Sequence, residues 1–454
     1  MSTLLSAGSS AEAQQPITVP ELVAYFHQGS KPESEWRVGA EFEKFALDRS
    51  TGRQIGYAEP GGIRDILQRL VERFGWEPHC EAEHLTTLTR LGSCVSLEPG
   101  GQVEFSTVPV RHVGELATEL ARHRDELRAV TDPAQIAWVA AGMTPFSRVE
   151  AIPLGPRRRH AVMAEYLPTR GPMALTMMKA TASTQVAFDY ADEADAVKKF
   201  AVALTLGPVV NAIWGNSALA NGESTGFASY RGQVWLGMDP DRSGTLANLL
   251  SDGLSFARWV DYLLDMPMLF TMREGEYEPA GGRSFREYLH RGIDGWFPTR
   301  FDWELHLTTV FPEVRLKNFL EIRGADANPP ALALAVPALW KGLLYDAEAL
   351  AAASEIATQF PPAALPGLFA AAARHGLAVD HGGRSLQTWC REVATIAAAG
   401  LQRQAERLGH PDERRFLDPM FEILDRGTSP GTAMLAEFGR TPVNVLAVLG
   451  QLEY

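Results

Sequence analysis

The segment Ser96–Ser106, SLEPGGQVEFS, predicts a β-hairpin with polar side chains close to its turn. Apolar residues alternate on both sides of the Pro-Gly-Gly sequence, at Val95, Leu97, Val103 and Phe105, as they do in half-buried strands. The two adjacent glycines permit the positive φ angles that a tight reversal needs. The apolar residues give the hairpin a reason to be ordered, but they do not account for Glu98, Gln102 and Glu104 beside the turn.

The length of the turn decides what these polar residues share. A two-residue turn sets Glu98 opposite Val103, facing away from Gln102 and Glu104, whereas a three-residue loop sets Glu98 opposite Gln102 and gathers all three on one face. The second geometry suits a hard cation. A solvated hairpin end is an equally good interpretation of this segment alone, because acidic residues are common near turns.

A second strand with paired acids is predicted over residues 38–47, VGAEFEKFAL. Val38, Ala40 and Phe42 alternate with Glu41 and Glu43, so the two carboxylates share one face. On a solvated edge their repulsion is screened by water. Facing the interior of a concave sheet, they need a cation between them, and Mg²⁺ or Mn²⁺ is the natural one for oxygen ligands.

Composition limits the class of protein. The chain has 454 residues, 46% of them hydrophobic and 21% charged, which is typical of a folded protein with a large core. The net charge of −13 argues against a general nucleic-acid binder, which needs a basic surface. No stretch of about 18 uninterrupted apolar residues is present, so we expect no membrane-spanning segment.

The cysteines and the N-terminus bear on the compartment. Cys80, Cys94 and Cys390 have no CxxC spacing, which excludes a disulfide scaffold and a thiolate zinc site and favours the reducing cytoplasm. Residues 1–17 lack a basic segment followed by a sustained apolar one, so we expect a flexible arm and not a secretion signal.

The remaining elements are predicted from periodicity and turn residues. We expect helices over 19–29, 61–74, 113–130 and 193–214, strands over 135–143 and 181–190, and several helices beyond Pro329. The basic run Arg157–His160 lies in a segment, 153–168, that favours a solvated loop. Residues 225–235 favour an aromatic-rich loop, and two interpretations of Arg231 stay open: stacking by Tyr230 or Phe227, or an ordinary surface position. No linker or repeat separates these parts, which predicts one domain.

The acids at strand-like positions set the chemistry that we expect. Phe319, Glu321 and Arg323 follow one another at a spacing of two residues, as side chains on one face of a strand do. Either Glu321 and Arg323 neutralise each other, or Glu321 binds metal while Arg323 binds phosphate. With Glu41, Glu43, Glu98 and Glu104, Glu321 completes a set of five carboxylates, enough for two or three Mg²⁺ ions on the phosphates of ATP. The chain has no P-loop and no GxGxxG after a strand, so such a sheet surface is left to bind the nucleotide.

Several blocks of the sequence resemble one family. VGAEFEKFAL, SLEPGGQVEFS, MMKATASTQVAFDY, GFASYRGQVW and HLTTVFPEVRLKNFLEIRGAD are similar, in order, to the plant and proteobacterial type of glutamate–cysteine ligase, of the glutamine synthetase-like superfamily. The resemblance implies an α+β fold in which a curved, mainly antiparallel sheet forms an active-site funnel with helices outside. It implies that residues 18–454 form the catalytic domain. It also implies ATP-dependent joining of L-glutamate to L-cysteine, the first step of glutathione biosynthesis.

The resemblance also implies roles for individual residues. It places Mg²⁺, or Mn²⁺, on Glu41, Glu43, Glu98, Glu104 and Glu321. It places Arg159, Arg231 and Gln185 at the glutamate substrate and Arg323, again with Gln185, near the phosphates of ATP; Glu43, Arg231 and Arg323 are the expected catalytic residues. The run Arg157–Arg159 is denser in arginine than the family's, which leaves open which of the three contacts substrate.

Other functions stay open at this stage. A related ligase with a different amine acceptor, a non-catalytic ATP- or glutamate-binding regulator on the same fold, and a metal hydrolase all fit parts of the pattern. The three cysteines do not fall at the positions of the plant regulatory disulfides, so we expect no equivalent redox switch. We expect a monomer or homodimer that binds neither nucleic acid nor membrane.

Overall fold

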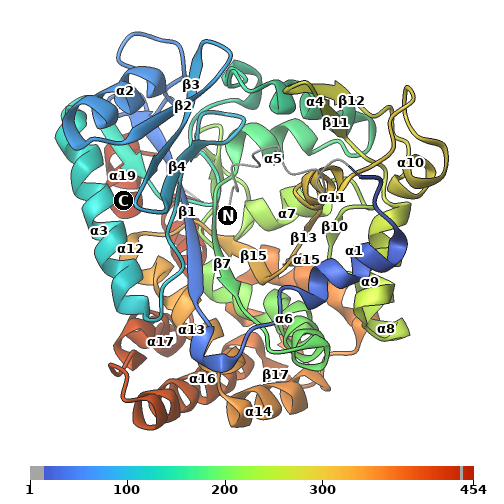
Figure 1. Cartoon of the computed structure of the whole chain (residues 1–454). Helices are drawn as coiled ribbons and strands as arrows, with labels where there is room; N and C mark the ends of the chain where they lie inside the picture. Colours follow the sequence, from blue (N-terminus) through green and yellow to red (C-terminus); the bar gives the residue numbers. More distant parts are fainter. Residues whose placement is uncertain (1–14, 440–442) are drawn as a thin grey trace.

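The computed structural model describes residues 15–439 and 443–454. Within these residues the centre of the fold is a nine-stranded, curved sheet in the order β14-β15-β7-β1-β5-β4-β3-β2, with β6 also paired to β1 (Figure 1). All of its strand pairs are antiparallel. Its strands are β1 (Val38–Asp48), β2 (Glu77–Glu81), β3 (His84–Arg90), β4 (Ser93–Leu97), β5 (Val103–Ser106), β6 (Ile136–Val139), β7 (Ser183–Phe188), β14 (Val314–Leu316) and β15 (Leu320–Asp326).

Short two-stranded pairs and many helices surround this sheet. The pairs are β8 (Leu219–Ala220) with β9 (Glu223–Ser224), β10 (Ser243–Gly244) with β13 (Phe311–Pro312), β11 (Phe270–Arg273) with β12 (Glu276–Pro279), and β16 (Asp380–His381) with β17 (Arg384–Ser385). The α-helices are α1 (Val19–His27), α2 (Ile63–Phe74), α3 (Val113–Val130), α4 (Arg158–Tyr166), α5 (Ala174–Ala180), α6 (Glu193–Trp214), α7 (Tyr230–Leu236), α8 (Ala247–Asp252), α9 (Phe256–Asp265), α10 (Phe285–Arg291), α11 (Arg300–Leu307), α12 (Pro330–Ala333), α13 (Ala335–Leu344), α14 (Ala347–Ala357), α15 (Leu365–His375), α16 (Leu386–Leu408), α17 (Asp418–Arg426), α18 (Pro430–Phe438) and α19 (Val445–Leu452).

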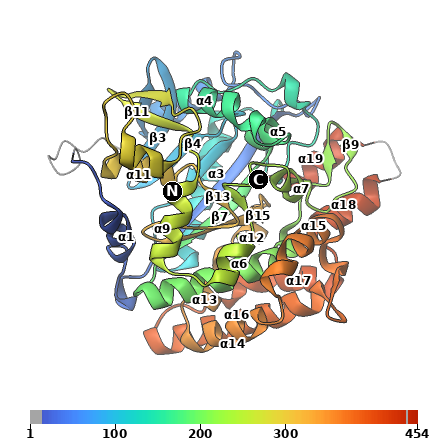
Figure 2. The ribbon, with the colours of Figure 1, turned by 90° about the vertical axis from the view of Figure 1, so that its right-hand side faces the viewer.

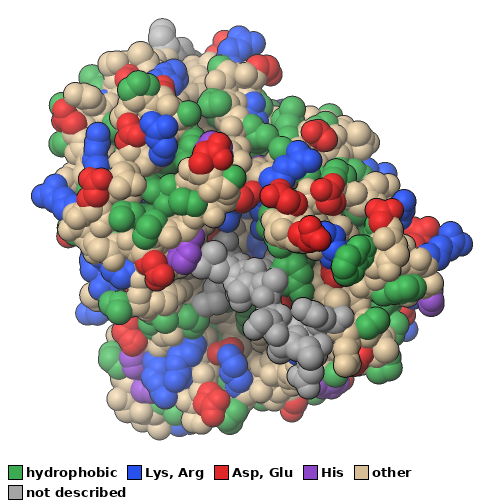
Figure 3. Space-filling model, turned by 45° about the horizontal axis from the view of Figure 1, so that its top comes forward, with side chains coloured by type: hydrophobic (Ala, Val, Ile, Leu, Met, Phe, Trp, Pro, Cys, Tyr) green, Lys and Arg blue, Asp and Glu red, His purple; other side chains and the backbone are tan. Residues whose placement is uncertain are grey.

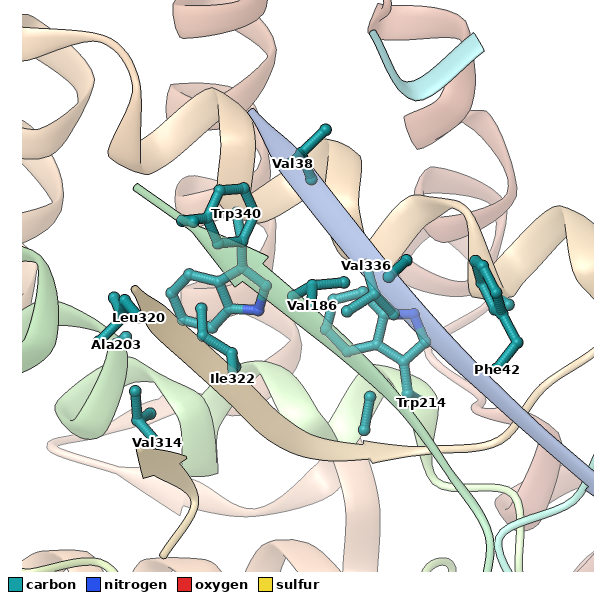
Figure 4. Packing of buried hydrophobic residues seen from close by; sticks show 14 of the residues in the cluster. Val38, Phe42, Val186, Ala203, Trp214, Val314, Leu320, Ile322, Val336 and Trp340 are labelled. Atoms are coloured by element: carbon teal, nitrogen blue, oxygen red, sulfur yellow. The ribbon is translucent and has the colours of Figure 1, made fainter. Parts of the chain in front are cut away.

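Strand β1 organises the sheet because it pairs with three other strands. Its first residues, 38–42, pair with β7, residues 41–44 pair with β5, and residues 45–48 pair with β6. Val38 and Phe42 point into the core, where Trp214 of α6 and Trp340 of α13 pack against the sheet (Figure 4). The residues of β1 that alternate with them, Glu41 and Glu43 among them, therefore face away from this core. We call this side of the sheet the cavity face.

The helices form a thick layer behind the core side of the sheet. Figure 2 shows α6 next to the sheet, with α13, α14 and α16 beyond it. Among the described residues, α6 is the one helix long and apolar enough to cross a membrane, but 78% of its apolar window is buried inside the protein. It is the central core helix of this layer, and its apolar composition is explained by that burial. Acidic and basic side chains are interspersed over the face shown in Figure 3.

The structure confirms the α+β architecture and the mainly antiparallel sheet, and α3 and α6 have the predicted bounds. Two predicted loops are wrong: residues 158–166 form α4, and residues 230–236 form α7, whose N-terminus is capped by the Ser229 side chain. The predicted strand 135–143 is shorter, Ile136–Val139. Of the predicted N-terminal arm, residues 1–14 lie outside the described residues, while Ile17 donates a backbone hydrogen bond to the Pro298 carbonyl.

Candidate active site

A polar cavity opens on the cavity face of the sheet. Its walls come from the strands of the sheet and from α4, α5 and α7, which are far apart in the sequence. The structure brings eight of the nine predicted site residues into its lining: Glu41, Glu43, Glu98, Glu104, Arg159, Gln185, Arg231 and Arg323. Glu321 lines a smaller neighbouring cavity together with Glu41 and Gln185.

The hairpin that carries Glu98 has the three-residue loop. Leu97 pairs with Val103, and the Glu98 N–H donates to the Gln102 carbonyl at 3.0 Å. Gly101 has φ +85°, which explains why glycine stands there. The Gln102 side chain accepts from the Gly100 N–H and donates to the Thr181 carbonyl. Gln102 therefore fixes the turn against the end of α5, and this turn aims Glu98 into the cavity.

Glu43 and Glu104 are cross-strand neighbours in the register of β1 and β5. Both side chains are buried, and like charges directly opposite each other destabilise a sheet. The Glu43 carboxylate accepts from the Ser183 N–H at 2.7 Å and the Gln185 amide at 2.8 Å, while Glu104 accepts from Ser96 and Ser106. Burial, and then the charge of Glu104, raise the pKa of Glu43.

Glu98 is the third member of this acidic cluster. Its side chain is half-buried, and burial followed by the charges of Glu104 and Glu43 raises its pKa to about 8. Arg157 and Arg159 oppose this shift without cancelling it. The raised pKa values of Glu43 and Glu98 beside Glu104 mark a site that a bound cation would stabilise.

The chemistry of this donor set fits a divalent cation with a preference for oxygen. Glu43, Glu98 and Glu104 offer oxygen atoms only, which suits Mg²⁺ or Mn²⁺. In the described part of the chain, however, no three or more His, Cys, Asp or Glu side chains converge closely enough to hold a metal ion by themselves. Mg²⁺ in nucleotide enzymes is usually held by one or two carboxylates plus substrate phosphates. The five metal ligands expected from the sequence therefore stay a prediction that needs the phosphates of ATP to complete the metal sites.

Glu321 lies instead in a cluster of cations. Its carboxylate is 2.5 Å from Arg315, 3.2 Å from Lys317 and 3.1 Å from Arg323. Burial raises the pKa of Glu321, but the three cations together outweigh burial and hold that pKa well below its usual range. The sequence left open whether Glu321 and Arg323 neutralise each other or whether Glu321 binds metal. The contacts in the structure are those of mutual neutralisation. They include two further cations, Arg315 and Lys317, that the sequence analysis did not single out.

Gln185 joins the acidic and the basic clusters. Its amide nitrogen donates to Glu43 at 2.8 Å, and its amide oxygen accepts from Arg323. In the sheet it lies opposite Glu41, and Glu41 in turn lies opposite Ser106. A neutral amide that bonds to both signs of charge holds the Arg323 guanidinium and the Glu43 carboxylate at a fixed separation.

Arg231 is buried in α7, and neither stacking by Tyr230 or Phe227 nor a surface position, the two interpretations that the sequence left open, describes its contacts. Its guanidinium donates to the carbonyls of Gly324 at 3.0 Å and Arg323 at 2.9 Å, and it lies over the Trp235 ring. These carbonyls belong to the place where the pairing of β15 with β7 shifts register. Arg231 thus supports the backbone that carries Arg323, while its remaining N–H groups are left for the cavity it lines.

The basic run divides its three arginines between two roles. Arg158 is exposed. Arg157 contacts Thr87, the Leu97 carbonyl and Glu81, which ties it to the strands beside the hairpin. Arg159 reaches across the cavity to the Thr308 hydroxyl at 3.3 Å. Arg157 and Arg159 both line the cavity, and Arg159 is the less committed to the surrounding protein.

The sequence analysis missed Ser183, Arg315 and Lys317. Ser183 binds Glu43 through both its N–H and its hydroxyl. Arg315 is the cross-strand partner of Glu321 in the β14–β15 hairpin. A signal was present, because Arg315 and Lys317 alternate with apolar residues just before a turn, as Glu321 and Arg323 do after it.

Comparison with known proteins shows the family of the chain. Residues 37–443 match the model of glutamate–cysteine ligase family 2. The chain belongs to this family. It is 35% identical to the chloroplastic glutamate–cysteine ligase of Brassica juncea over 93% of its length and 81% of that protein. It is 36% identical to the chloroplastic glutamate–cysteine ligase A of Oryza sativa subsp. indica, over 93% of its length and 85% of that protein.

A solved structure shares the fold at low sequence identity. The glutamate–cysteine ligase of Francisella tularensis in complex with AMP superposes with a TM-score of 0.51 at 11% identity, over 92% of this chain and 87% of that one. At this identity the likeness concerns the fold alone.

The expected cytoplasmic location is contradicted by these relatives, because those of Brassica juncea, Arabidopsis thaliana, Nicotiana tabacum and Oryza sativa are all chloroplastic enzymes. The expectation rested on few, unpaired cysteines, and Cys80, Cys94 and Cys390 are indeed free thiols. Free thiols indicate a reducing compartment, but they do not distinguish one reducing compartment from another.

Proposed function

We propose that this protein joins the γ-carboxylate of L-glutamate to the amine of L-cysteine at the expense of ATP, the first step of glutathione biosynthesis. Membership of the glutamate–cysteine ligase family and the identity of its plant relatives support the reaction. The observation on the molecule that carries the proposal is one cavity face with buried carboxylates and buried cations joined by Gln185. Such a face suits two substrates that both carry negative charge.

The chemistry explains why ATP is needed. A carboxylate is a poor acyl donor because oxide would have to leave, so an oxygen of the γ-carboxylate first attacks the γ-phosphorus of ATP. An O–P bond forms, the bond to the β,γ-bridging oxygen breaks, and ADP leaves. The cysteine amine then attacks the acyl carbon of the γ-glutamyl phosphate. The C–N bond forms, the C–O bond to phosphate breaks, and the amine loses one proton.

The arginines are proposed to bind and orient the anionic groups. Arg159 and Arg231 line the cavity on the side of α4 and α7, where they would bind the α-carboxylate of glutamate. Arg323, held between Gln185 and Glu321, would bind the transferred phosphoryl group. Fixed donors of this kind contribute mainly by positioning the reacting groups and by stabilising charge in the transition state.

A divalent cation is proposed to be held by one or two of the carboxylates of Glu43, Glu98 and Glu104 together with the phosphates of ATP, with Mg²⁺ preferred and Mn²⁺ as a substitute. When bound, it supplies positive charge that reduces the repulsion between ATP and the glutamate carboxylate. Glu41 and Glu321, which line the smaller neighbouring cavity, stay predicted metal ligands. Their metal site would be completed by the phosphates of ATP. We expect EDTA to abolish ADP release, Mg²⁺ or Mn²⁺ to restore it, and the larger Ca²⁺ to restore less. Full turnover in EDTA would contradict the metal assignment.

The decisive experiment measures ADP release with Mg²⁺, ATP and L-glutamate, with and without L-cysteine, and identifies the product by mass. We expect ADP release that depends on cysteine and a γ-linked dipeptide. Release with other amines but not with cysteine would change the acceptor and leave the mechanism. No turnover with any amine would favour a binding protein, and phosphate release without ATP would favour a hydrolase. Sedimentation of the same preparation tests the expectation of a monomer or homodimer.

A further inference from the structure

A second cavity lies next to the first one along the cavity face. Thr308 and Lys317 line both cavities, so the two share a wall. The small cavity lined by Glu41, Gln185 and Glu321 also reaches Gly39 and Ala187, which line the second cavity. The two large cavities therefore adjoin each other beside β1 and β7, and we refer to them together as the groove.

The floor of the second cavity is made by small residues. Gly39 of β1 and Ala187 of β7 are cross-strand partners, one row beyond the pair of Glu41 and Gln185. In this row the side chains are only a hydrogen atom and a methyl group, in place of the carboxylate of Glu41 and the amide of Gln185. Such a floor leaves room for a flat ring to lie against the sheet, and Tyr25 and Phe319 in the same lining offer aromatic surface to it.

Lys317 lies at the junction of the two cavities. Its ammonium group is 3.2 Å from the Glu321 carboxylate and lies over the Phe319 ring. Its neighbour Arg315 is committed to protein groups, since it donates to Glu321 at 2.7 Å and to the Val310 carbonyl at 2.9 Å. An ammonium group has three N–H donors, so Lys317 can still donate to an anionic ligand that extends from one cavity into the other.

The order of groups along the groove matches one class of ligand. A nucleoside triphosphate has a flat base at one end and a chain of phosphates at the other. With its terminal phosphate beside Arg323 in the first cavity, its phosphate chain crosses Lys317 and its base reaches Gly39 and Ala187. No other cation that lines both large cavities is present in the described residues.

We propose that the second cavity holds the nucleoside of the triphosphate substrate and that Lys317 binds the phosphates between the two cavities. The proposal rests on the proposed ATP-dependent reaction and assigns its nucleotide to a named part of the groove. Lys317 is in this view a phosphate-binding residue, and Ala187 sets the space available to the base.

The test measures binding of ADP and of inorganic tripolyphosphate, each with Mg²⁺, by isothermal titration calorimetry. Ala187→Leu fills the floor without changing any charge, so we expect ADP to bind at least tenfold more weakly and tripolyphosphate within twofold of the unaltered protein. Lys317→Gln is expected to weaken both probes about tenfold. Ala129→Leu and Lys198→Gln make the same changes in cavities elsewhere on the molecule and should leave both affinities unchanged.

Two results would overturn the proposal. Unchanged ADP affinity in folded Ala187→Leu would remove the nucleoside from the second cavity, and unchanged affinity for both probes in Lys317→Gln would remove the phosphate role. If thermal unfolding shows that Ala187→Leu does not fold, Gly39→Ala adds one methyl group to the same floor and should weaken ADP about threefold. An unaltered protein that binds ADP but makes no γ-glutamyl dipeptide would instead refute the proposed reaction.

Discussion

The charge of Glu43 is the feature of a single residue on which the proposed site depends most. Its carboxylate is buried opposite Glu104 and accepts hydrogen bonds from Ser183 and Gln185. Glu43→Gln keeps the size of the side chain and an oxygen acceptor but removes the charge. Losing one electrostatic group of this kind typically costs about 3 to 4 kcal/mol of transition-state stabilisation, so we expect kcat to fall about a hundredfold or more.

The measurement is steady-state turnover together with thermal unfolding. Removing one of two opposed buried carboxylates relieves repulsion, so the variant should unfold at the same temperature as the unaltered protein or higher. Glu72→Gln, on the exposed face of α2, is the matched control and should change neither quantity. Turnover like that of the unaltered protein in Glu43→Gln would remove Glu43 from the site.

Arg231 is expected to act on both stability and substrate binding. Arg231→Ala leaves the carbonyls of Arg323 and Gly324 without their donors, and an unsatisfied buried polar group costs about 1 to 3 kcal/mol. We expect the free energy of unfolding to fall by about 2 kcal/mol or more and the KM for glutamate to rise. Urea unfolding and initial-rate kinetics measure the two effects. An unchanged KM would leave Arg231 a support of β15 alone, and Arg258→Ala on the surface of α9 is the control.

At the scale of single residues, the sequence predicted positions better than partners. Period-two alternation correctly placed Glu41 and Glu43 on one face of their strand, because strand geometry alone determines which side chains share a face; it left open whether that face was solvated or lined a cavity. It did not predict that Glu321 contacts Arg315 and Lys317, because that depends on how two short strands pair across a turn. It also missed that the Arg231 guanidinium is occupied by backbone carbonyls, which no side-chain pattern reveals.

The β4–β5 hairpin is the element whose position matters most to the site. A Cβ added at Gly100 would lie 2.1 Å from the Lys179 carbonyl at the end of α5. Because that neighbour is backbone, Gly100→Ala must move the turn away from α5, and Glu98 moves with it. Displacing a catalytic group by about 1 Å costs up to a hundredfold in rate, so we expect kcat to fall between about tenfold and a hundredfold.

The control for this variant is Gly367→Ala in α15, where an added Cβ meets nothing within 4 Å. Alanine is the better helix former, so this control should be neutral or stabilising by up to about 1 kcal/mol. Turnover and thermal unfolding are compared for both variants. Gly100→Ala with full turnover would show that the contact between the hairpin and α5 does not position Glu98.

Elements were predictable where one physical signal dominated. The hairpin has apolar alternation on both sides of two glycines, α3 has apolar residues at helical spacing, and α6 is a long apolar segment between Asp192 and Gly215, so their type and bounds follow from local sequence. Helices α4 and α7 were missed because they are short, begin within polar or aromatic loops and owe their stability to the cavity walls they complete. Short helices depend on tertiary packing more than on propensity.

At the scale of the whole molecule, burial of neutral histidines makes stability depend on pH. His123, His160 and His306 are buried, and burial lowers the pKa of each; for His306, burial and to a lesser extent Arg242 lower it from 6.5 to about 4. Below pH 6.5 the unfolded chain binds protons that the folded protein does not. The stability that these groups contribute is therefore complete above pH 6.5 and is lost as the pH falls towards 4.

His306→Gln isolates one of these groups. A glutamine amide can still donate to the Leu263 carbonyl, which lies 2.9 Å from the His306 ring nitrogen, but it does not titrate. Between pH 7 and pH 5 the unaltered protein should lose about 2 kcal/mol more of its free energy of unfolding than the variant loses. Urea unfolding at the two pH values measures this difference, with exposed His290→Gln as the control. Equal losses in the unaltered protein and in His306→Gln would mean that His306 has the same pKa in the folded and unfolded states, and the acid sensitivity would then have to come from the other buried histidines, His123 and His160.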